Sequence, residues 1–380
     1  MTIEEARTLF PHLKTEQIYF NHASLGPWCE LALKRINEYA LQRSGEKIEN
    51  YEYFLKWNLS AKEKLGKLIG TTPDRIAWID NVSNGLNLLA QGLKWNTGDK
   101  IILNDIEFPS NVYPFMNLKK HGVEIEFIKN RNGIVDAEDI EKAITPKTKL
   151  ISISYVQFLS GYKANIDAIG ELCKKHNIIF CVDAIQAAGV VQIDVQKSKI
   201  DFLAGGTQKW LMSSQGLSYI FITEELQEQI EQKYVGWISV ENAWNLLDYN
   251  LKLRKNADRF QTGTINALGV AIFDAVLNLF SDFGMENIES HILDNTNYFI
   301  EKLSESGLNP ILKNASSRNR AGIVTFKHDK AKKIFDELEE RKIYCAVREG
   351  MIRFSPHFYN TKEEIDCVLE NLNEIIKMLE

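Results

Sequence analysis

The sequence of 380 residues predicts an α/β protein with one large layered domain and a smaller α+β domain. Three observations lead to this prediction. Short apolar runs alternate with amphipathic stretches from Thr72 to about Thr223, which is the pattern of strands and helices in a layered sheet. After Phe283 the pattern changes to a long helix followed by mixed strands and helices. The length of the chain also suits one large and one smaller domain.

The apolar runs are interpreted as buried parallel strands because each is short and is bounded by polar residues or glycine. Strands are expected at Trp78–Val82, Lys100–Asn104, Val123–Ile128, Lys149–Ser154, Ile178–Val182, Asp201–Ala204 and Leu217–Ile222. Helices are expected at Cys29–Gln42, Trp57–Ile69, Ile166–His176 and Ala267–Phe283. The aromatic run Tyr51–Trp57 indicates helix packing rather than a cofactor site.

The C-terminal part is predicted to form the small domain, because strand and helix runs of its order are typical of an α+β unit. Its elements are expected at Met285–Ser304, Ala321–Phe326, Lys330–Arg341, Ile343–Val347, Met351–Ser355 and a helix from Lys362. We expect residues 20–265 to form the large domain, and residues 1–19 together with 266–380 to form the small one.

Composition excludes several classes of function. The net charge of −6 argues against a nucleic-acid partner. No apolar run approaches the length of a membrane span, and the acidic, polar start is unlike a signal peptide. The five cysteines are dispersed, with no CxxC pair and no histidine at ligand spacing, which favours a cytoplasmic protein without a structural metal. Neither GxGxxG nor GxxxxGK[ST] occurs, which argues against a nicotinamide dehydrogenase and a P-loop enzyme.

An aspartate and a lysine follow two successive predicted strands. Asp183 stands at the carboxyl end of the strand Ile178–Val182, where open α/β sheets bind ligands. It can pair with a protonated pyridine nitrogen or cap the next helix. Lys209 follows the strand Asp201–Ala204 after a predicted turn at Gly205–Thr207. A partly desolvated lysine has a lowered pKa and can form a Schiff base with an aldehyde.

This ordered set, with Gln186 between Asp183 and Lys209, resembles a known superfamily. The chain is similar to class V aminotransferase-like enzymes of fold type I, which depend on pyridoxal 5′-phosphate and include cysteine desulfurases, isopenicillin N epimerase-like proteins and kynureninases. The resemblance runs from Ile18–Pro27 to Met351–Thr361. It implies a mostly parallel seven-stranded sheet flanked by helices, a small C-terminal α+β domain and pyridoxal 5′-phosphate as the cofactor.

Two glycine-bearing turns are implied to bind the cofactor phosphate. Ser83, Asn84 and Gly85 precede an apolar helix, whose free amides suit an anion, although Ser83 can also be an ordinary N-cap. In the superfamily this turn holds the phosphate. The loop Gln261–Thr264 resembles one that reaches across a dimer interface, with Thr264 at the position that contacts the partner's cofactor. The resemblance therefore implies a homodimer.

Further residues are assigned to the cofactor by the same resemblance. Phe108, in the segment Asp105–Asn111, replaces a histidine of cysteine desulfurases and can stack on the ring but cannot carry a proton. A core phenylalanine before a proline turn is the alternative interpretation. Gln186 is implied to bond the phenolic oxygen of the cofactor, and Gln208 stands beside the lysine where many relatives have histidine.

Arg353 is the expected substrate anchor. It matches the arginine that binds an amino-acid carboxylate in the superfamily, and a guanidinium binds carboxylates through two hydrogen bonds. Its apolar neighbours Ile352 and Phe354 argue against a surface strand arginine. Asn21 and His22 are further candidates for the substrate pocket, and His22 can equally be a hydrogen-bonded structural histidine.

Two departures from the superfamily bear on the reaction. Cysteine desulfurases carry a cysteine loop between the segments that match Ala346–Gly350 and Met351–Ser355, but here these segments abut. Cys345 lies in an apolar stretch and is expected to be a buried structural thiol, so a persulfide-forming desulfurase is disfavoured. A lyase that needs no such cysteine stays open, as does the choice between transamination, elimination and epimerisation.

The second departure is at Gln157 and Phe158, where relatives have asparagine. Together with the phenylalanine at 108, this departure gives some support to the interpretation that the protein binds a ligand without turnover. The presence of Asp183, Lys209 and Arg353 together favours an enzyme, with Lys209 as the general acid or base.

Overall fold

The computed structural model describes residues 1–379, and its largest element is a seven-stranded sheet with the strand order β2-β8-β7-β6-β5-β3-β4. Only β8 runs antiparallel to its neighbours, which confirms the mostly parallel sheet. The strands are β2 (Ile76–Ile79), β3 (Lys100–Asn104), β4 (Glu124–Ile128), β5 (Thr148–Ser154), β6 (Ile179–Asp183), β7 (Phe202–Gly206) and β8 (Ser218–Ile222).

Both faces of this sheet are buried, as a parallel sheet requires. Ile102 belongs to one hydrophobic cluster, while Ile101 and Leu103 belong to a second cluster on the opposite face. The first cluster includes side chains of α3 (Tyr51–Ile69), α7 (Ile166–His176) and α9 (Ala267–Phe283), and the second includes α4 (Val82–Gly92). The remaining helices of this part are α2 (Glu30–Leu41), α5 (Tyr113–Met116), α6 (Ala137–Ala143) and α8 (Glu224–Gln229).

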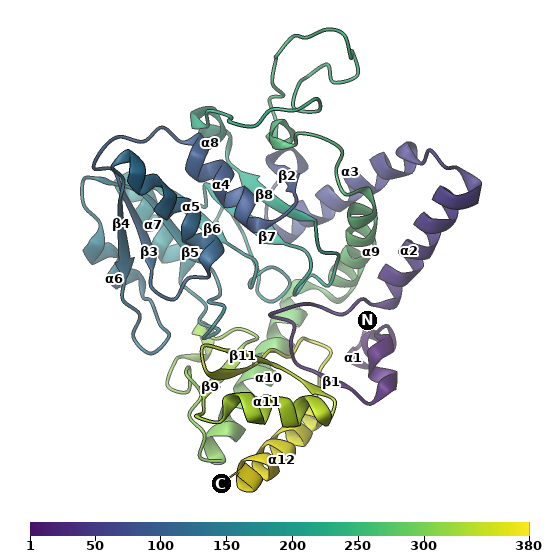
Figure 1. Cartoon of the computed structure of the whole chain (residues 1–380), viewed down its shortest axis with the longest axis vertical. Coiled ribbons are helices and arrows are strands. Elements are labelled where there is room, and N and C mark those ends of the chain that lie inside the picture. Colours follow the sequence, from purple (N-terminus) through teal and green to yellow (C-terminus); the bar gives the residue numbers. More distant parts are fainter. Residues whose placement is uncertain (380) are drawn as a thin grey trace.

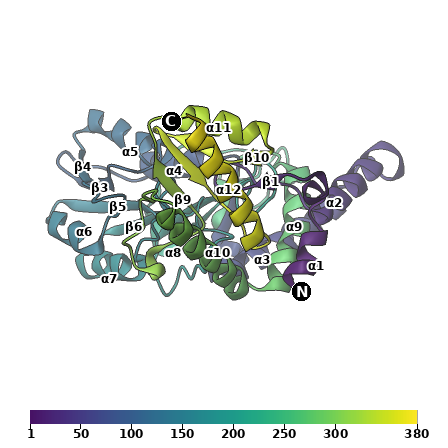
Figure 2. The ribbon, with the colours of Figure 1, turned by 90° about the horizontal axis from the view of Figure 1, so that it is seen from below.

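The C-terminal part forms a separate layer below the large sheet in Figure 1. It contains a three-stranded antiparallel sheet of β11 (Ala346–Arg348), β12 (Met351–Phe354) and β9 (Val324–Lys327). Its helices are α10 (Met285–Glu305), α11 (Ala331–Glu340) and α12 (Lys362–Leu379), which lie in front of the large domain in the view from below (Figure 2).

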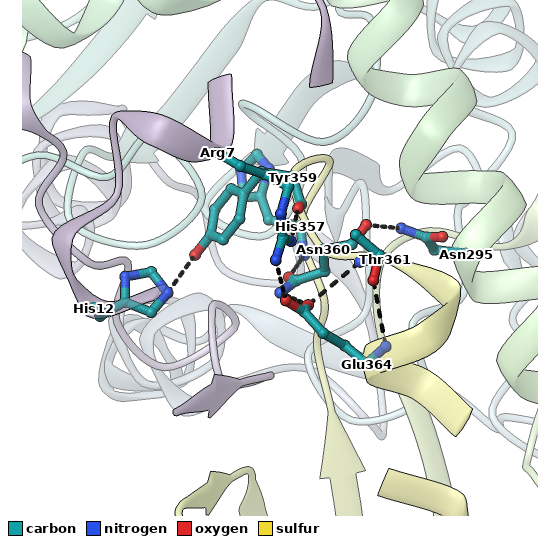
Figure 3. Close-up of polar contacts among 8 residues, drawn as sticks. All are labelled: Arg7, His12, Asn295, His357, Tyr359, Asn360, Thr361 and Glu364. Carbon is teal, nitrogen blue, oxygen red and sulfur yellow. Dashed lines mark hydrogen bonds and ion pairs between the residues drawn. The ribbon is translucent and has the colours of Figure 1, made fainter. Parts of the chain in front are cut away.

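The N-terminal segment joins this C-terminal part. After α1 (Ile3–Thr8), the strand β1 (Ile18–Tyr19) pairs in parallel with β10 (Ile343–Tyr344). Figure 3 shows further contacts: Arg7 forms an ion pair with Glu364 at 2.7 Å and donates a hydrogen bond to the carbonyl of Tyr359 at 2.6 Å. The predicted domain bounds, 20–265 and 266–380 with 1–19, remain predictions.

Two sequence-based expectations near the ligand edge are wrong. The strand predicted at Trp78–Val82 ends at Ile79, because Asn81 accepts a hydrogen bond from the Asn84 amide at 2.9 Å and starts α4 at Val82. The turn predicted at Gly205–Thr207 starts later, because Gly205 and Gly206 belong to β7 and pair with Tyr219 and Ser218. Glycine is needed at 205, where a Cβ would lie 2.4 Å from the Tyr219 ring.

Several other elements agree with the sequence. The bounds of β3, α7 and α9 are those predicted, and α3 begins at Tyr51, so the aromatic run is part of a packed helix. Within residues 1–379 no single helix has the length and composition of a membrane span, although the bent pair α9 and α10 passes by length and composition alone.

Candidate active site

The carboxyl ends of the parallel strands place the predicted functional residues at one edge of the sheet. Asp183 is the last residue of β6 and pairs with Ser154, the last residue of β5. Lys209 follows β7, the other neighbour of β6. The structure therefore brings the two residues to adjacent strand ends, as the sequence predicts.

Asp183 is buried and has one free oxygen. Its Oδ1 accepts a hydrogen bond from the Ile185 amide at 2.9 Å, while its Oδ2 is buried without a partner. Burial raises the pKa of this carboxyl to about 7, although the Ile185 amide opposes the shift. A buried oxygen without a donor is costly. This oxygen fits the N–H of a protonated pyridine ring, and the helix-cap alternative leaves it unexplained.

Lys209 is largely desolvated. Burial, together with the nearby charge of Arg353, lowers the pKa of its amine to about 8, so more of the amine is neutral at neutral pH than for an ordinary lysine. The backbone around it is fixed by Gly26, whose amide donates to the Gln208 carbonyl at 2.8 Å. A Cβ at Gly26 would lie 2.1 Å from the Lys209 carbonyl oxygen, so only glycine fits there. The amine suits covalent bonding to an aldehyde.

Phe108 lies beside the lysine. The centre of its ring is 5.7 Å from the Lys209 Nζ and 5.2 Å from the Phe158 ring, which packs edge-on. The side chain is 41% exposed, so the alternative of a core phenylalanine is wrong. Its aromatic face is therefore available to a planar ligand on the lysine.

Glu107, which was not predicted from the sequence, holds the loop that carries Phe108. Its buried carboxylate accepts hydrogen bonds from the Ser154 amide at 2.8 Å and the Gln157 amide nitrogen at 2.9 Å. Asn104 and Asn111 donate to the same carboxylate. The available signal was an acidic residue in the short loop after a buried strand. These bonds tie the loop after β3 to the end of β5, with Gln157 in a structural role.

The first turn of α4 provides an anion site. The Val82 and Ser83 amides at the start of this turn have no partner within the helix, whereas the Asn84 amide is bonded to the Asn81 side chain. The Ser83 hydroxyl donates to the Ser110 hydroxyl at 2.8 Å. Ser83 is not the N-cap, because Asn81 has that position. The side chain of Asn84 instead donates to both oxygens of Asp80.

Gly85 has a packing role in the same turn. A Cβ there would lie 2.6 Å from Ile79 and 2.9 Å from Ile220, so glycine lets α4 approach the sheet closely.

Gln186 connects the edge of the sheet to the N-terminal segment. Its amide donates to the Ala23 carbonyl at 3.0 Å and accepts from the Trp210 indole at 2.7 Å. Both ends of the side chain are thus bonded within the protein, and its predicted bond to the cofactor stays a prediction. Gln208 contributes its backbone carbonyl to Gly26, and a cofactor contact of its side chain also stays a prediction.

Arg353 is buried, with only 2% of its surface exposed, so the alternative of a surface strand arginine is wrong. Its guanidinium donates to the Phe158 carbonyl at 2.8 Å and to the Ser24 hydroxyl at 2.9 Å, and its Nε is buried without a partner. Burial and the nearby Arg348 lower the pKa of Arg353 to about 9. This guanidinium can bind a carboxylate close to Lys209.

The two N-terminal candidates differ. His22 is fully buried, its Nδ1 donates to the Ser355 carbonyl at 2.8 Å, and its Nε2 accepts from the Tyr359 hydroxyl at 2.7 Å. The structural interpretation of His22 is therefore favoured, and no ring nitrogen is free for a substrate. Asn21 has a buried Oδ1 without a partner, so it keeps an acceptor for a ligand, and its substrate role stays a prediction.

Thr264 lines a cavity that is not lined by Lys209. Gln261 accepts a hydrogen bond from the Trp78 amide at 3.0 Å and fixes the start of the loop. Thr264 is exposed and lines a cavity of about 690 Å³ together with Asn84 and Gly216. Lys209 is not among the residues that line this cavity, and the predicted cofactor role of Thr264 stays a prediction.

The hairpin near Arg353 confirms that the two segments abut. Only Glu349 and Gly350 separate β11 from β12, and both have positive φ, 48° and 72°. Cys345 is 3% exposed, and burial raises the pKa of its thiol to about 12. A neutral, buried thiol is a poor nucleophile.

Comparisons with known proteins agree with this geometry. The sequence profile of the family described as aminotransferase class-V matches residues 19–368. An uncharacterized aminotransferase of Bacillus subtilis, YcbU, is 29% identical over 97% of both chains. A probable cysteine desulfurase of Pyrococcus abyssi is 30% identical over 99% of this chain and 98% of its own.

Solved structures show the same fold. The apo cysteine desulfurase of Thermococcus onnurineus NA1 has a TM-score of 0.90 at 26% identity, covering 100% of this chain and 99% of that protein. The cystine C-S lyase C-DES, in complex with cysteine persulfide, has a TM-score of 0.86 at 24% identity, covering 96% and 99%.

The site fits the cofactor that the resemblance implies. Asp183 offers an unpartnered oxygen for a pyridine nitrogen, Lys209 a desolvated amine for an aldehyde, and the first turn of α4 free amides for a phosphate. The family match covers most of the chain. The chain therefore belongs to the aminotransferase class-V family and is a pyridoxal 5′-phosphate-dependent enzyme.

Proposed function

We propose that the enzyme acts on an amino acid, with Lys209 holding the cofactor through a Schiff base and then moving a proton at the substrate Cα. The observation that carries this proposal is the desolvated Lys209 amine beside the unpartnered Asp183 oxygen. When bound, the cofactor supplies an electron sink that allows a bond at Cα to break. A neutral amine is the form that accepts a proton, and the lowered pKa of Lys209 supplies it.

The other residues bind and orient. Asp183 keeps the pyridine nitrogen protonated, because a carboxylate in a buried site stabilises a neighbouring positive charge. Phe108, beside Lys209, would stack on the cofactor ring, Ser83 would hold its phosphate, and Arg353 would bind the substrate carboxylate. The charge of Arg353 lowers the pKa of Lys209, which supports a carboxylate bound near the proton-transfer site.

The chemistry proposed is transamination, or a lyase or epimerase reaction that needs no cysteine nucleophile. The two-residue turn between β11 and β12 supports this choice, since it leaves no loop for a cysteine there. Cys345 is buried with a raised pKa. An enzyme-bound persulfide on this hairpin is therefore not part of the proposal, although several relatives are named probable cysteine desulfurases.

We also propose that the active unit is a homodimer in which Thr264 reaches the partner's cofactor. The segment between α8 and α9 protrudes at the top of Figure 1 and exposes large apolar side chains, including Tyr234 (72%), Leu247 (82%) and Tyr249 (89%). Such a patch is typical of a protein interface. A cytoplasmic location is proposed because all five cysteines are free, which fits a reducing compartment.

The test is the visible absorption spectrum of the purified protein with pyridoxal 5′-phosphate, before and after a mixture of amino acids is added. A yellow band that shifts on addition supports the proposal. Lys209→Ala should lose the lysine-bound band and all turnover, while Lys175→Ala, which removes an exposed lysine, should keep both. A fully active Lys209→Ala variant would refute the assignment.

A further inference from the structure

Arg348 and Arg353 lie on the same face of the β11–β12 hairpin. Arg353 pairs directly with Ala346, so these two side chains share a face of the sheet. Ala346 and Arg348 are two residues apart on one strand and also share a face. The two arginines are therefore diagonal neighbours across the hairpin, and the short turn at Glu349 and Gly350 fixes this arrangement.

Ser24 connects the two guanidinium groups. Its hydroxyl accepts a hydrogen bond from Arg353 at 2.9 Å and another from Arg348 at 3.3 Å. The distance between the two donor nitrogens is therefore at most the sum of these two hydrogen-bond lengths. Both cations meet at one neutral oxygen, where water is partly excluded by the buried Arg353.

The N-terminal segment that carries Ser24 is fixed to the small domain. Arg7 contacts Glu364 and the Tyr359 carbonyl, as Figure 3 shows, and the Ala23 amide donates to the Ser355 hydroxyl at 3.0 Å. Ser24, Arg348 and Arg353 are consequently held on one structural unit. Arg353 is buried on this unit, and the exposed Arg348 is held next to it by its hydrogen bond to Ser24.

Among residues 1–379, no carboxylate forms an ion pair with Arg348 or Arg353 within 4.0 Å. The Nε of Arg353 is buried without a partner. The two acidic groups at the strand ends have other partners, since Glu107 accepts from the Ser154 and Gln157 nitrogens and Asp183 accepts from the Ile185 amide. Like charges so close are unfavourable without an anion between them. One substrate carboxylate leaves one of these two charges unbalanced.

We propose that Arg348 binds a second anionic group, at the end of the substrate side chain, so that the enzyme prefers acidic amino acids. This inference rests on the proposed function for the amino-acid part of the substrate. The buried Arg353 binds the α-carboxylate, and the exposed Arg348 binds the side-chain carboxylate or another oxyanion. Ser24 holds the two guanidinium groups at a fixed separation, which makes it a positioning residue for both.

Isothermal titration calorimetry with succinate and butyrate tests the proposal without turnover. These ligands have the same carbon count, but only succinate has a second carboxylate. The purified wild-type protein should bind succinate at least about tenfold more tightly than butyrate, the size of effect expected for one charge-assisted contact. Arg348→Met should remove this preference, and Arg348→Lys should restore part of it. Arg353→Met should weaken the binding of both ligands.

The matched control is Arg341→Met, which removes a guanidinium that pairs with Glu374 on α12 and should leave the preference unchanged. Equal affinity of the wild type for succinate and butyrate would overturn the proposal, and so would an Arg348→Met variant that keeps the preference. Equal losses for both ligands in Arg348→Met would show that the two arginines share a single carboxylate. Because the titration needs neither cofactor chemistry nor Lys209, its outcome is separate from that of the spectroscopic test above.

Discussion

The Nζ atom of Lys209 lies 5.7 Å from the centre of the Phe108 ring, although the two residues follow different strands of the large sheet. The lysine comes from the end of β7 and the phenylalanine from the loop after β3, which Glu107 ties to β5. The contact brings an aromatic face to the amine that is assigned to the cofactor. Four predictions follow from this arrangement and its surroundings.

The first concerns Asp183. Asp183→Asn removes the negative charge that we assign to the pyridine nitrogen while keeping the size of the side chain. We expect the affinity for pyridoxal 5′-phosphate to fall at least about tenfold, because a charge-assisted hydrogen bond becomes a neutral one. Absorbance titration of the apoprotein measures this affinity. Asp248→Asn, on the protruding segment, is the control, and equal affinities in the two variants would contradict the role given to Asp183.

The second concerns the pH dependence of cofactor capture. The pKa of the Lys209 amine is about 8, so the amine is mostly protonated at lower pH. Only the neutral form attacks an aldehyde. The rate of pyridoxal 5′-phosphate capture by the apoprotein should therefore rise about tenfold per pH unit below 8 and level off above it. Stopped-flow absorbance gives this profile. A midpoint near 10.5, the ordinary value for lysine, would show that burial does not tune this amine.

The third concerns His357, which is buried as a neutral ring. Its Nε2 donates to the Trp210 carbonyl at 2.9 Å, and its Nδ1 accepts from the Phe358 amide at 2.8 Å. Burial lowers the pKa of His357 to about 4. The unfolded chain then binds more protons between pH 6.5 and 4, so this residue makes the folded state less stable as the pH falls through that window.

Urea unfolding of the wild type and His357→Gln at pH 7.5 and pH 5 tests this sign. The variant should be less stable at both pH values, because it loses buried hydrogen bonds. The difference in free energy of unfolding between the wild type and the variant should be about 2 kcal/mol smaller at pH 5 than at pH 7.5, because at pH 5 protonation of His357 in the unfolded chain destabilises the folded wild type. Comparison within each pH cancels the opposite contribution of Asp183, whose raised pKa favours the folded state as the pH falls. A deficit that is constant or grows would contradict the neutral assignment.

The fourth concerns Cys345. Cys345→Ala deletes one buried sulfur and should lower the free energy of unfolding by roughly 1 kcal/mol, with turnover of amino acids retained. Activity assays and chemical denaturation measure the two quantities. Loss of all turnover in a folded Cys345→Ala variant would place this thiol in the reaction, against its burial and raised pKa.

Much of the fold could be predicted from the sequence, because apolar periodicity carries it. The strand Lys100–Asn104 and the helices Ile166–His176 and Ala267–Phe283 have the predicted bounds. The end of β2 could not be predicted from periodicity, because α4 starts where the Asn81 side chain caps it. The continuation of β7 through Gly206 depends on pairing with β8, which no local pattern of glycines reveals.

The site was predictable where a residue stands at a strand end or shortly after it, as Asp183 and Lys209 do. The contacts of Ser24 with Arg348 and Arg353, and of Glu107 with Ser154 and Gln157, join segments distant in the sequence. Such contacts come from tertiary packing and have no periodic signal. His22 shows the same limit, because its two partners lie more than 300 residues away in the chain.

The most direct test of the central assignment is borohydride reduction of the protein loaded with pyridoxal 5′-phosphate, followed by peptide mass spectrometry. Reduction fixes a Schiff base as a stable secondary amine, so the modified lysine can be located. We expect the phosphopyridoxyl group on the peptide that contains Lys209, and no such group on that peptide in Lys209→Ala. Labelling of another lysine in the wild type, with Lys209 unmodified, would contradict it.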